Sequence, residues 1–140
     1  MGRRKQIKAT LQYPQHAFNP EDLLHFIELD GFSDDWKDLG LDDEALTALQ
    51  LAIMAEGKNA PVISGTGGVR KLRFAPDSWH TGKSGAARIC FAYFEEYGIV
   101  LLVAAYSKNE HDAISAAGKK LFSKLVKEAQ SELARVKGLG

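Results

Sequence analysis

Six basic side chains and one tyrosine between residues 70 and 108 are the groups best suited to do chemistry in this sequence. They are Arg70, Lys71, Arg73, Lys83, Arg88, Tyr106 and Lys108. Gathered together, such cations bind phosphates by Coulomb attraction and counterion release. They can also stabilise a pentavalent phosphate dianion, and they lower the pKa of a neighbouring lysine. A nuclease without a metal is therefore chemically feasible, and the simpler alternative is a set of ordinary exposed charges.

Strand patterning decides whether these cations can meet. Residues 69–75 alternate, so that Lys71 and Arg73 share one face, and Arg88 lies at the start of the next apolar segment. Tyr106 and Lys108, two residues apart, end the last such segment on a common face. If the three segments pair as an antiparallel meander, the basic residues gather on one side of the sheet, and we expect the side chains of Arg73 and Arg88 to face solvent.

Two glycine-rich segments resemble phosphate-binding loops but do not have the required spacing. They are Gly65–Gly68 and Gly82–Ser84, and each precedes an expected strand, where a phosphate loop would precede a helix. Binding of a nucleoside triphosphate is therefore not expected. The segment Gly65–Gly68 is predicted to be a tight turn.

Histidine and cysteine are too sparse for a metal site. The four histidines (His16, His25, His80, His111) show no i, i+4 pair, and the single cysteine, Cys90, lies in an apolar segment. We therefore expect no metal and no cofactor, and we expect Cys90 to be buried. His80 is of interest for RNA binding because it lies in the loop between basic strands.

Periodicity predicts an α+β fold with the element order β-α-α-β-β-β-α and helices packed on a mostly antiparallel sheet. The expected strands cover residues 26–29, 69–75, 86–94 and 99–106, and a short helix is possible at 21–26. Ser33 and Asp42 are predicted to cap two helices ending near Leu39 and Gly57, and Ser115 a third that reaches Val136. The apolar stripe of that third helix is Leu121, Phe122, Leu125, Val126, Ala129 and Leu133, with lysines on the other side.

Length and composition indicate one globular domain. The chain has 140 residues, of which 45% are hydrophobic, and no apolar run is long enough to cross a bilayer. Residues 1–20 are expected to form a flexible basic arm and residues 21–140 the domain, in the cytoplasm. The formal net charge of zero conceals a strongly acidic segment at 20–56 between basic segments on either side.

Three motifs resemble the HigB-like toxins of the RelE/ParE superfamily, which belong to type II toxin-antitoxin pairs. The segment Gly65–Ala75 resembles the approach to the second strand and that strand itself. Gly82–Ile89 resembles the following turn with its arginine, and Tyr106–Glu110 resembles the Tyr-x-Lys-Asn-Glu motif that closes the last strand. The similarity covers about residues 26–130. The loop at 76–84 differs in having a single lysine together with Trp79 and His80.

The resemblance implies a RelE-like, microbial RNase-like fold and a toxin that cleaves mRNA on the ribosome, inhibiting translation, with a cognate antitoxin as its partner. In this interpretation Lys71, Arg73 and Arg88 hold the scissile phosphate, and a lysine among Lys71, Lys83 and Lys108 accepts the proton of the 2′-hydroxyl. Tyr106 stacks on a base or donates a hydrogen bond. The RNA-binding residues are Arg70, Lys83 and His80.

Two alternatives remain open from the sequence. One is a non-enzymatic superfamily member of the ParE type that inhibits a topoisomerase, for which the cationic cluster is not needed. The other is a degenerate toxin retained as an RNA- or protein-binding module, which the low charge of the loop at 76–84 favours.

Overall fold

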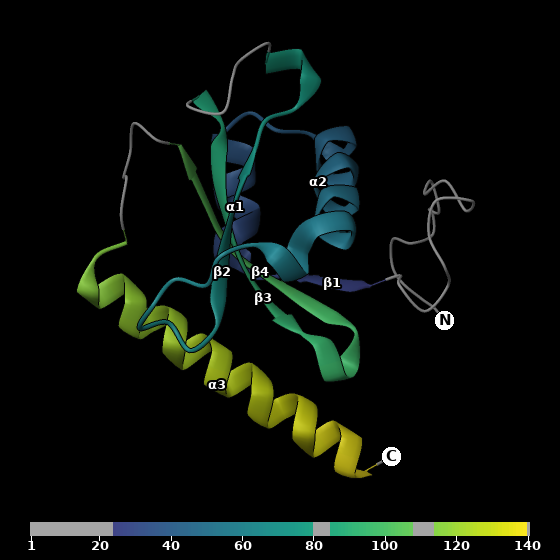
Figure 1. Ribbon diagram of the computed structural model, residues 1–140, viewed down its shortest axis with the longest axis vertical. Helices are drawn as coiled ribbons and strands as arrows, with labels where there is room; N and C mark the ends of the chain where they lie inside the picture. The colour runs from purple at the N-terminus through teal and green to yellow at the C-terminus, as the bar shows by residue number, and fades with distance from the viewer. Residues whose placement is uncertain (1–23, 80–84, 108–113, 140) are drawn as a thin grey trace.

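The computed structural model of the protein describes residues 24–79, 85–107 and 114–139. Within these residues the chain forms four strands and three helices, with three short 3-10 turns between them (Figure 1). In chain order they are β1 (His25–Glu28), α1 (Asp30–Asp38), α2 (Asp43–Glu56), β2 (Val69–Phe74), β3 (Ala87–Phe94), β4 (Ile99–Ser107) and α3 (Ala116–Leu139). The predicted α+β class and element order are confirmed.

A single four-stranded sheet organises the molecule, with the spatial order β1-β4-β3-β2. Strands β2, β3 and β4 form an antiparallel meander, whereas β1 lies parallel to β4 at one edge. Between β3 and β4 the register shifts next to Cys90, where β4 inserts an extra residue. Such a bulge increases the local twist of the sheet.

Helices α1 and α2 cover one face of the sheet. Phe32 and Trp36 of α1 and Leu49 and Ile53 of α2 pack against alternate residues of the strands, including the fully buried Phe91. Each large apolar side chain removed from water in this way stabilises the fold by about 1.5–3 kcal/mol. Asp42 caps α2 as predicted, because its carboxylate accepts a hydrogen bond from the backbone N–H of Ala45 at 2.9 Å.

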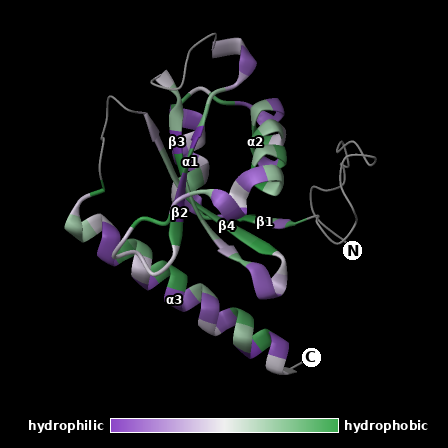
Figure 2. Ribbon diagram, in the orientation of Figure 1, coloured by the Kyte–Doolittle hydropathy of each residue, from purple (hydrophilic) through white to green (hydrophobic). Residues whose placement is uncertain are grey.

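Helix α3 covers part of the opposite face. Phe122 and Val126 pack against strand residues such as Val69 and Ala92 in a second core. Strands β3 and β4 are mostly hydrophobic, whereas β2 and α3 mix hydrophobic and hydrophilic residues along their length (Figure 2). The prediction that Leu121 belongs to the buried stripe is wrong, since 54% of its surface is exposed. Its position in α3 points it away from the Phe122–Val126 face.

Helix α1 begins earlier than the sequence suggested. It starts at Asp30, includes Gly31, and has Leu29 at its N-cap position without a side-chain cap. Ser33 is therefore inside the helix, and its hydroxyl donates a hydrogen bond to Glu28 instead of capping. The short helix expected at 21–26 is also wrong from His25 onward, because that residue opens β1. Pairing with β4, a contact remote in sequence, determines this local structure.

None of the helices within the described ranges is both long enough and apolar enough to cross a membrane. The expected basic arm at 1–20 lies outside the described residues.

Candidate functional site

The sheet register places three of the predicted site residues side by side. Arg73 of β2 pairs with Arg88 of β3, which in turn pairs with Tyr106 of β4. Lys71 lies two residues before Arg73, on the same face and opposite Cys90. This is the face on which α3 packs, because Cys90 and Tyr106 belong to the core that α3 covers. We call Lys71, Arg73, Arg88 and Tyr106 the cationic row.

The pairing of Arg73 with Arg88 has an electrostatic cost. Directly paired residues on neighbouring strands have Cβ atoms about 4.5–5.5 Å apart, and like charges in that relation destabilise a sheet. Within the described part of the chain, neither arginine nor Lys71 has a carboxylate partner within ion-pairing distance. No described carboxylate therefore neutralises the positive charge of these three residues, and Arg73 is the one whose side chain is exposed to an anionic ligand.

Arg88 is buried, contrary to the expectation that its side chain faces solvent. Only 5% of its surface is exposed, and its guanidinium donates a hydrogen bond to the carbonyl oxygen of Ala86 at 2.7 Å. The reason is its position on the inner strand β3, where Arg73 and Tyr106 flank it on both sides. Arg73, on the edge strand β2, is exposed as predicted.

Tyr106 is buried as well, with 5% of its surface exposed, among the apolar residues of the α3 core. The expectation that a base stacks on this ring is therefore wrong, because the ring is covered by its neighbours. Its position next to Arg88 makes it a neighbour of any phosphate bound at the row.

Arg70 lies on the opposite face of the sheet from the cationic row. Its guanidinium donates hydrogen bonds to the carbonyl oxygens of Ala60, at 2.7 Å, and Lys58, at 3.2 Å. These bonds tie β2 to the segment that follows α2. Its assignment to RNA binding stays a prediction, and the structure does not bring it together with Lys71 and Arg73.

Cys90 lies in the same face as the row and is fully buried, as predicted. Burial raises the pKa of its thiol to about 12, and the nearby Lys71 ammonium partly offsets this effect, while Asp35 adds to it. A thiol held in its neutral form is a poor nucleophile, so Cys90 is part of the core.

Three predicted site residues, His80, Lys83 and Lys108, lie outside the described residues. Among the residues that are described, no group of three or more His, Cys, Asp or Glu side chains is arranged to hold a metal ion.

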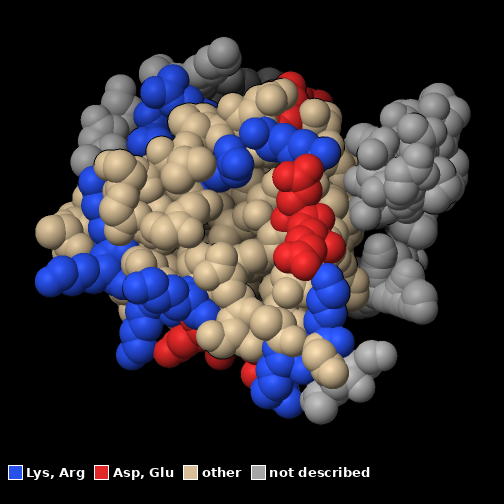
Figure 3. Space-filling model, turned by 60° about the horizontal axis from the view of Figure 1, so that its bottom comes forward, with Lys and Arg blue, Asp and Glu red and all other residues tan. Residues whose placement is uncertain are grey.

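A second basic region lies on α3, where the sequence placed lysines opposite the apolar stripe but indicated no function for them. The helix has lysines at positions 119, 120, 124 and 127, and several of them line an open groove with Gly65. Lysine and arginine side chains are spread over this side of the molecule, with a band of acidic side chains among them (Figure 3). The signal was present as the i, i+4, i+7 spacing of Lys120, Lys124 and Lys127, but that spacing is also typical of a solvated helix face.

Comparisons with known proteins give a distant structural neighbour. No family model matches the sequence. Among solved structures, the chain is similar to an arginine-to-alanine double mutant of the E. coli toxin RelE in the free state. The TM-score is 0.43 with 10% sequence identity, over 62% of this chain and 85% of the toxin. The function of this chain is therefore inferred from its own residues.

Proposed function

We propose that this protein is a RelE-like toxin of a toxin-antitoxin pair that cleaves mRNA on the ribosome. The observation that supports the proposal is the cationic row, in which two arginines are paired across strands without a carboxylate among the described residues to neutralise them. The three sequence motifs that resemble HigB-like toxins include all four residues of the row.

In this proposal the row stabilises the transition state of an internal phosphoryl transfer. The 2′-hydroxyl oxygen of one nucleotide attacks the adjacent phosphorus and loses its proton to a lysine of the set Lys71, Lys83 and Lys108. The bond between phosphorus and the 5′-oxygen breaks, and that oxygen takes up a proton. The products are a 2′,3′-cyclic phosphate and a 5′-hydroxyl end. Arg73 and Arg88 offset the extra negative charge that develops on the phosphate oxygens.

A second candidate function is binding of RNA without cleavage. The burial of Arg88 and Tyr106 favours it, because a row with two covered members offers only Lys71 and Arg73 directly to a ligand. A binding module would still use the positive face but would leave the RNA chain intact.

Inducible expression in a bacterial host distinguishes these functions. The proposal predicts growth arrest together with new 5′ ends within translated regions of cellular transcripts, both suppressed by the cognate antitoxin. A binding module predicts RNA that co-purifies with the protein and no new ends. Growth arrest with intact transcripts and altered DNA supercoiling would instead indicate a topoisomerase inhibitor.

A further inference from the structure

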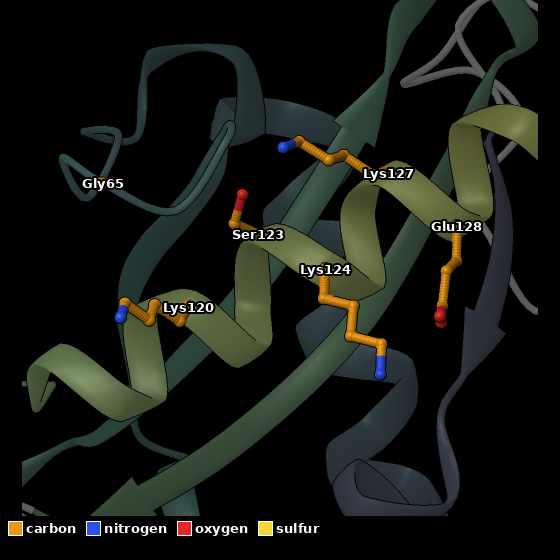
Figure 4. Close-up of a pocket in the computed structure, with 6 residues that line it drawn as sticks. All are labelled: Gly65, Lys120, Ser123, Lys124, Lys127 and Glu128. Carbon is orange, nitrogen blue, oxygen red and sulfur yellow. The ribbon is translucent and has the colours of Figure 1, made fainter.

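A basic groove lies along α3, next to Gly65 in the loop that precedes β2. Its volume is about 420 Å³, and its lining consists of Gly65, Lys120, Ser123, Lys124, Lys127 and Glu128. Ser123 and Lys127 point to the side of α3 where the loop of Gly65 lies, whereas Lys124 and Glu128 point to the other side (Figure 4). We call this feature the α3 groove.

The loop wall of the groove is fixed in place. Thr66 is fully buried, and its hydroxyl donates to the carbonyl oxygen of Ile63 at 2.6 Å and accepts from the N–H of Val69 at 3.0 Å. Gly67 has φ +77°, and a Cβ atom there would lie 3.4 Å from the Ser123 hydroxyl. The loop therefore seats closely on α3, and the groove exists before any ligand arrives.

The charge of the groove is poorly neutralised. Lys119, Lys120, Lys124 and Lys127 form no ion pair with any described carboxylate, and Glu128 is the one acid in the lining. Farther along α3, in contrast, Arg135 pairs with Glu132 and Lys137 with Glu96. Lys119 and Lys120 also lie near the start of α3, where the helix dipole is positive and disfavours cations.

We propose that the α3 groove is a second phosphate-binding site, which holds the RNA backbone beside the cationic row. This inference rests on the proposed function, because it extends the RNA path from the row to α3. The lining contains no apolar side chain, so it lacks the buried anchors that a bound peptide needs.

Groove and row are continuous along one strand. The loop of Gly65 leads directly into β2, whose residues Val69 and Lys71 lie on the α3 face. Since a strand advances about 3.3 Å per residue, β2 spans about 20 Å. One RNA strand can therefore contact the α3 groove near the start of β2 and the cationic row near its end.

The test compares two double substitutions on the same helix. K120Q/K127Q removes two positive charges from the groove, and R135Q/K137Q removes two from the ion-paired end of α3. The probe is a fluorescently labelled 20-nucleotide single-stranded RNA, with its dissociation constant measured by anisotropy at several salt concentrations. Circular dichroism checks that each variant is folded, which we expect because Lys120 and Lys127 are exposed.

K120Q/K127Q should bind the RNA about tenfold more weakly at 0.1 M salt, with a salt slope about 1.4 smaller, because each lost phosphate contact removes about 0.7. R135Q/K137Q should bind within about twofold of the wild type. Glu128→Gln, which removes the acid from the groove, should strengthen binding. Equal binding by both double variants, or no binding by the wild type at low salt, would overturn the proposal.

The experiment also separates the groove from the proposed function. Anisotropy needs no cleavage, so weaker binding by K120Q/K127Q supports the groove even if the wild type leaves translated mRNA intact. Conversely, if the wild type cleaves mRNA and K120Q/K127Q binds RNA as tightly as the wild type, the α3 groove is not a phosphate-binding site and the proposed nuclease function still stands. Loss of binding to anionic lipid vesicles with unchanged RNA binding would assign the lysines to a membrane surface instead.

Discussion

Arg73 and Arg88 are neighbours across two strands, yet they occupy different environments. Arg73 is exposed on an edge strand, whereas Arg88 is buried on an inner strand and hydrogen-bonded to Ala86. Substitution of Arg88 would change packing as well as charge, because its aliphatic stem is covered. Arg73 is therefore the residue at which charge can be removed with the least effect on the fold.

Arg73→Ala should lower the rate of mRNA cleavage by about 10²–10³, the usual cost of losing one electrostatic donor to a transition state. The free energy of unfolding should change by less than about 0.5 kcal/mol, as for most surface substitutions. Lys37→Ala, at an exposed position on α1 across the sheet, is the control and should cleave normally. Wild-type cleavage by folded Arg73→Ala would contradict the assignment.

The Cys90 thiol should not react with iodoacetamide at pH 8 until the protein is unfolded. Its pKa in the folded protein is raised from 9.0 to about 12, mainly by burial. Above pH 9 the unfolded chain loses this proton and the folded chain keeps it, so stability falls as the pH rises from 9 to 12. The free energy of unfolding should fall by about 1.4 kcal/mol per pH unit at most.

Urea unfolding between pH 8 and 11 gives the free energy of unfolding of the wild type and of Cys90→Ala at each pH. The effect is the difference between the two proteins in the slope of this free energy against pH. The variant loses some packing energy at every pH but lacks the thiol's contribution to the slope. Parallel pH profiles for the two proteins, or rapid labelling of the native thiol, would show that Cys90 is more accessible to water than the structure indicates.

At the scale of elements, the strands of the meander could be predicted because each carries its own alternation or apolar run. The parallel pairing of β1 with β4 could not, since it depends on a contact about 75 residues away, as in His25 with Ile99. The burial of Arg88 was missed for a related reason. Strand β3 is covered on both faces, and its burial pattern shows no alternation from which exposure can be deduced.

Helix α1 is attached to the sheet by a contact that no sequence pattern indicates. The Asp35 carboxylate accepts a hydrogen bond from the backbone N–H of Ala105 at 2.9 Å. β1 pairs with β4 only as far as Leu102, so the backbone of β4 beyond that residue needs another partner. The carboxylate serves this purpose and fixes α1 against the end of β4.

Asp35→Ala should therefore reduce the free energy of unfolding by about 1–3 kcal/mol, the cost of a buried donor left without an acceptor. Asp35→Asn retains an acceptor oxygen and should lose less. Asp34→Ala, at the exposed neighbouring position of α1, controls for helix propensity. The measurement is chemical unfolding of all three variants, and equal losses for Asp34→Ala and Asp35→Ala would reject the role given to this contact.

Within the described residues, acidic side chains are most frequent on α1 and α2, and lysines are most frequent on α3. Most acidic residues of the segment 20–56 lie on α1 and α2, and four lysines without a described ion pair, Lys119, Lys120, Lys124 and Lys127, lie on α3, across the sheet. Charge along the sequence predicted an acidic face, because the acidic segment at 20–56 contains both α1 and α2. The position of the α3 groove could not be predicted, since it depends on how the loop of Gly65 seats against Ser123.

An acidic antitoxin should bind the basic side, over the cationic row or α3, and not the acidic helices at 33–56. Its association rate should fall steeply with added salt, because opposite potentials steer the encounter. Hydrogen exchange of the complex and stopped-flow association at several salt concentrations measure both effects. Protection confined to residues 33–56, or a rate indifferent to salt, would contradict this placement.

Cleavage of mRNA on the ribosome by the cationic row is the activity that we propose for this protein. Its most direct test is a reconstituted translation reaction with purified protein and a defined mRNA, in which primer extension maps new 5′ ends over time. We expect new 5′-hydroxyl ends with wild-type protein only when ribosomes translate the mRNA, and very few with Arg73→Ala. Intact mRNA with folded wild-type protein on active ribosomes, or equal cleavage by Arg73→Ala, would contradict it.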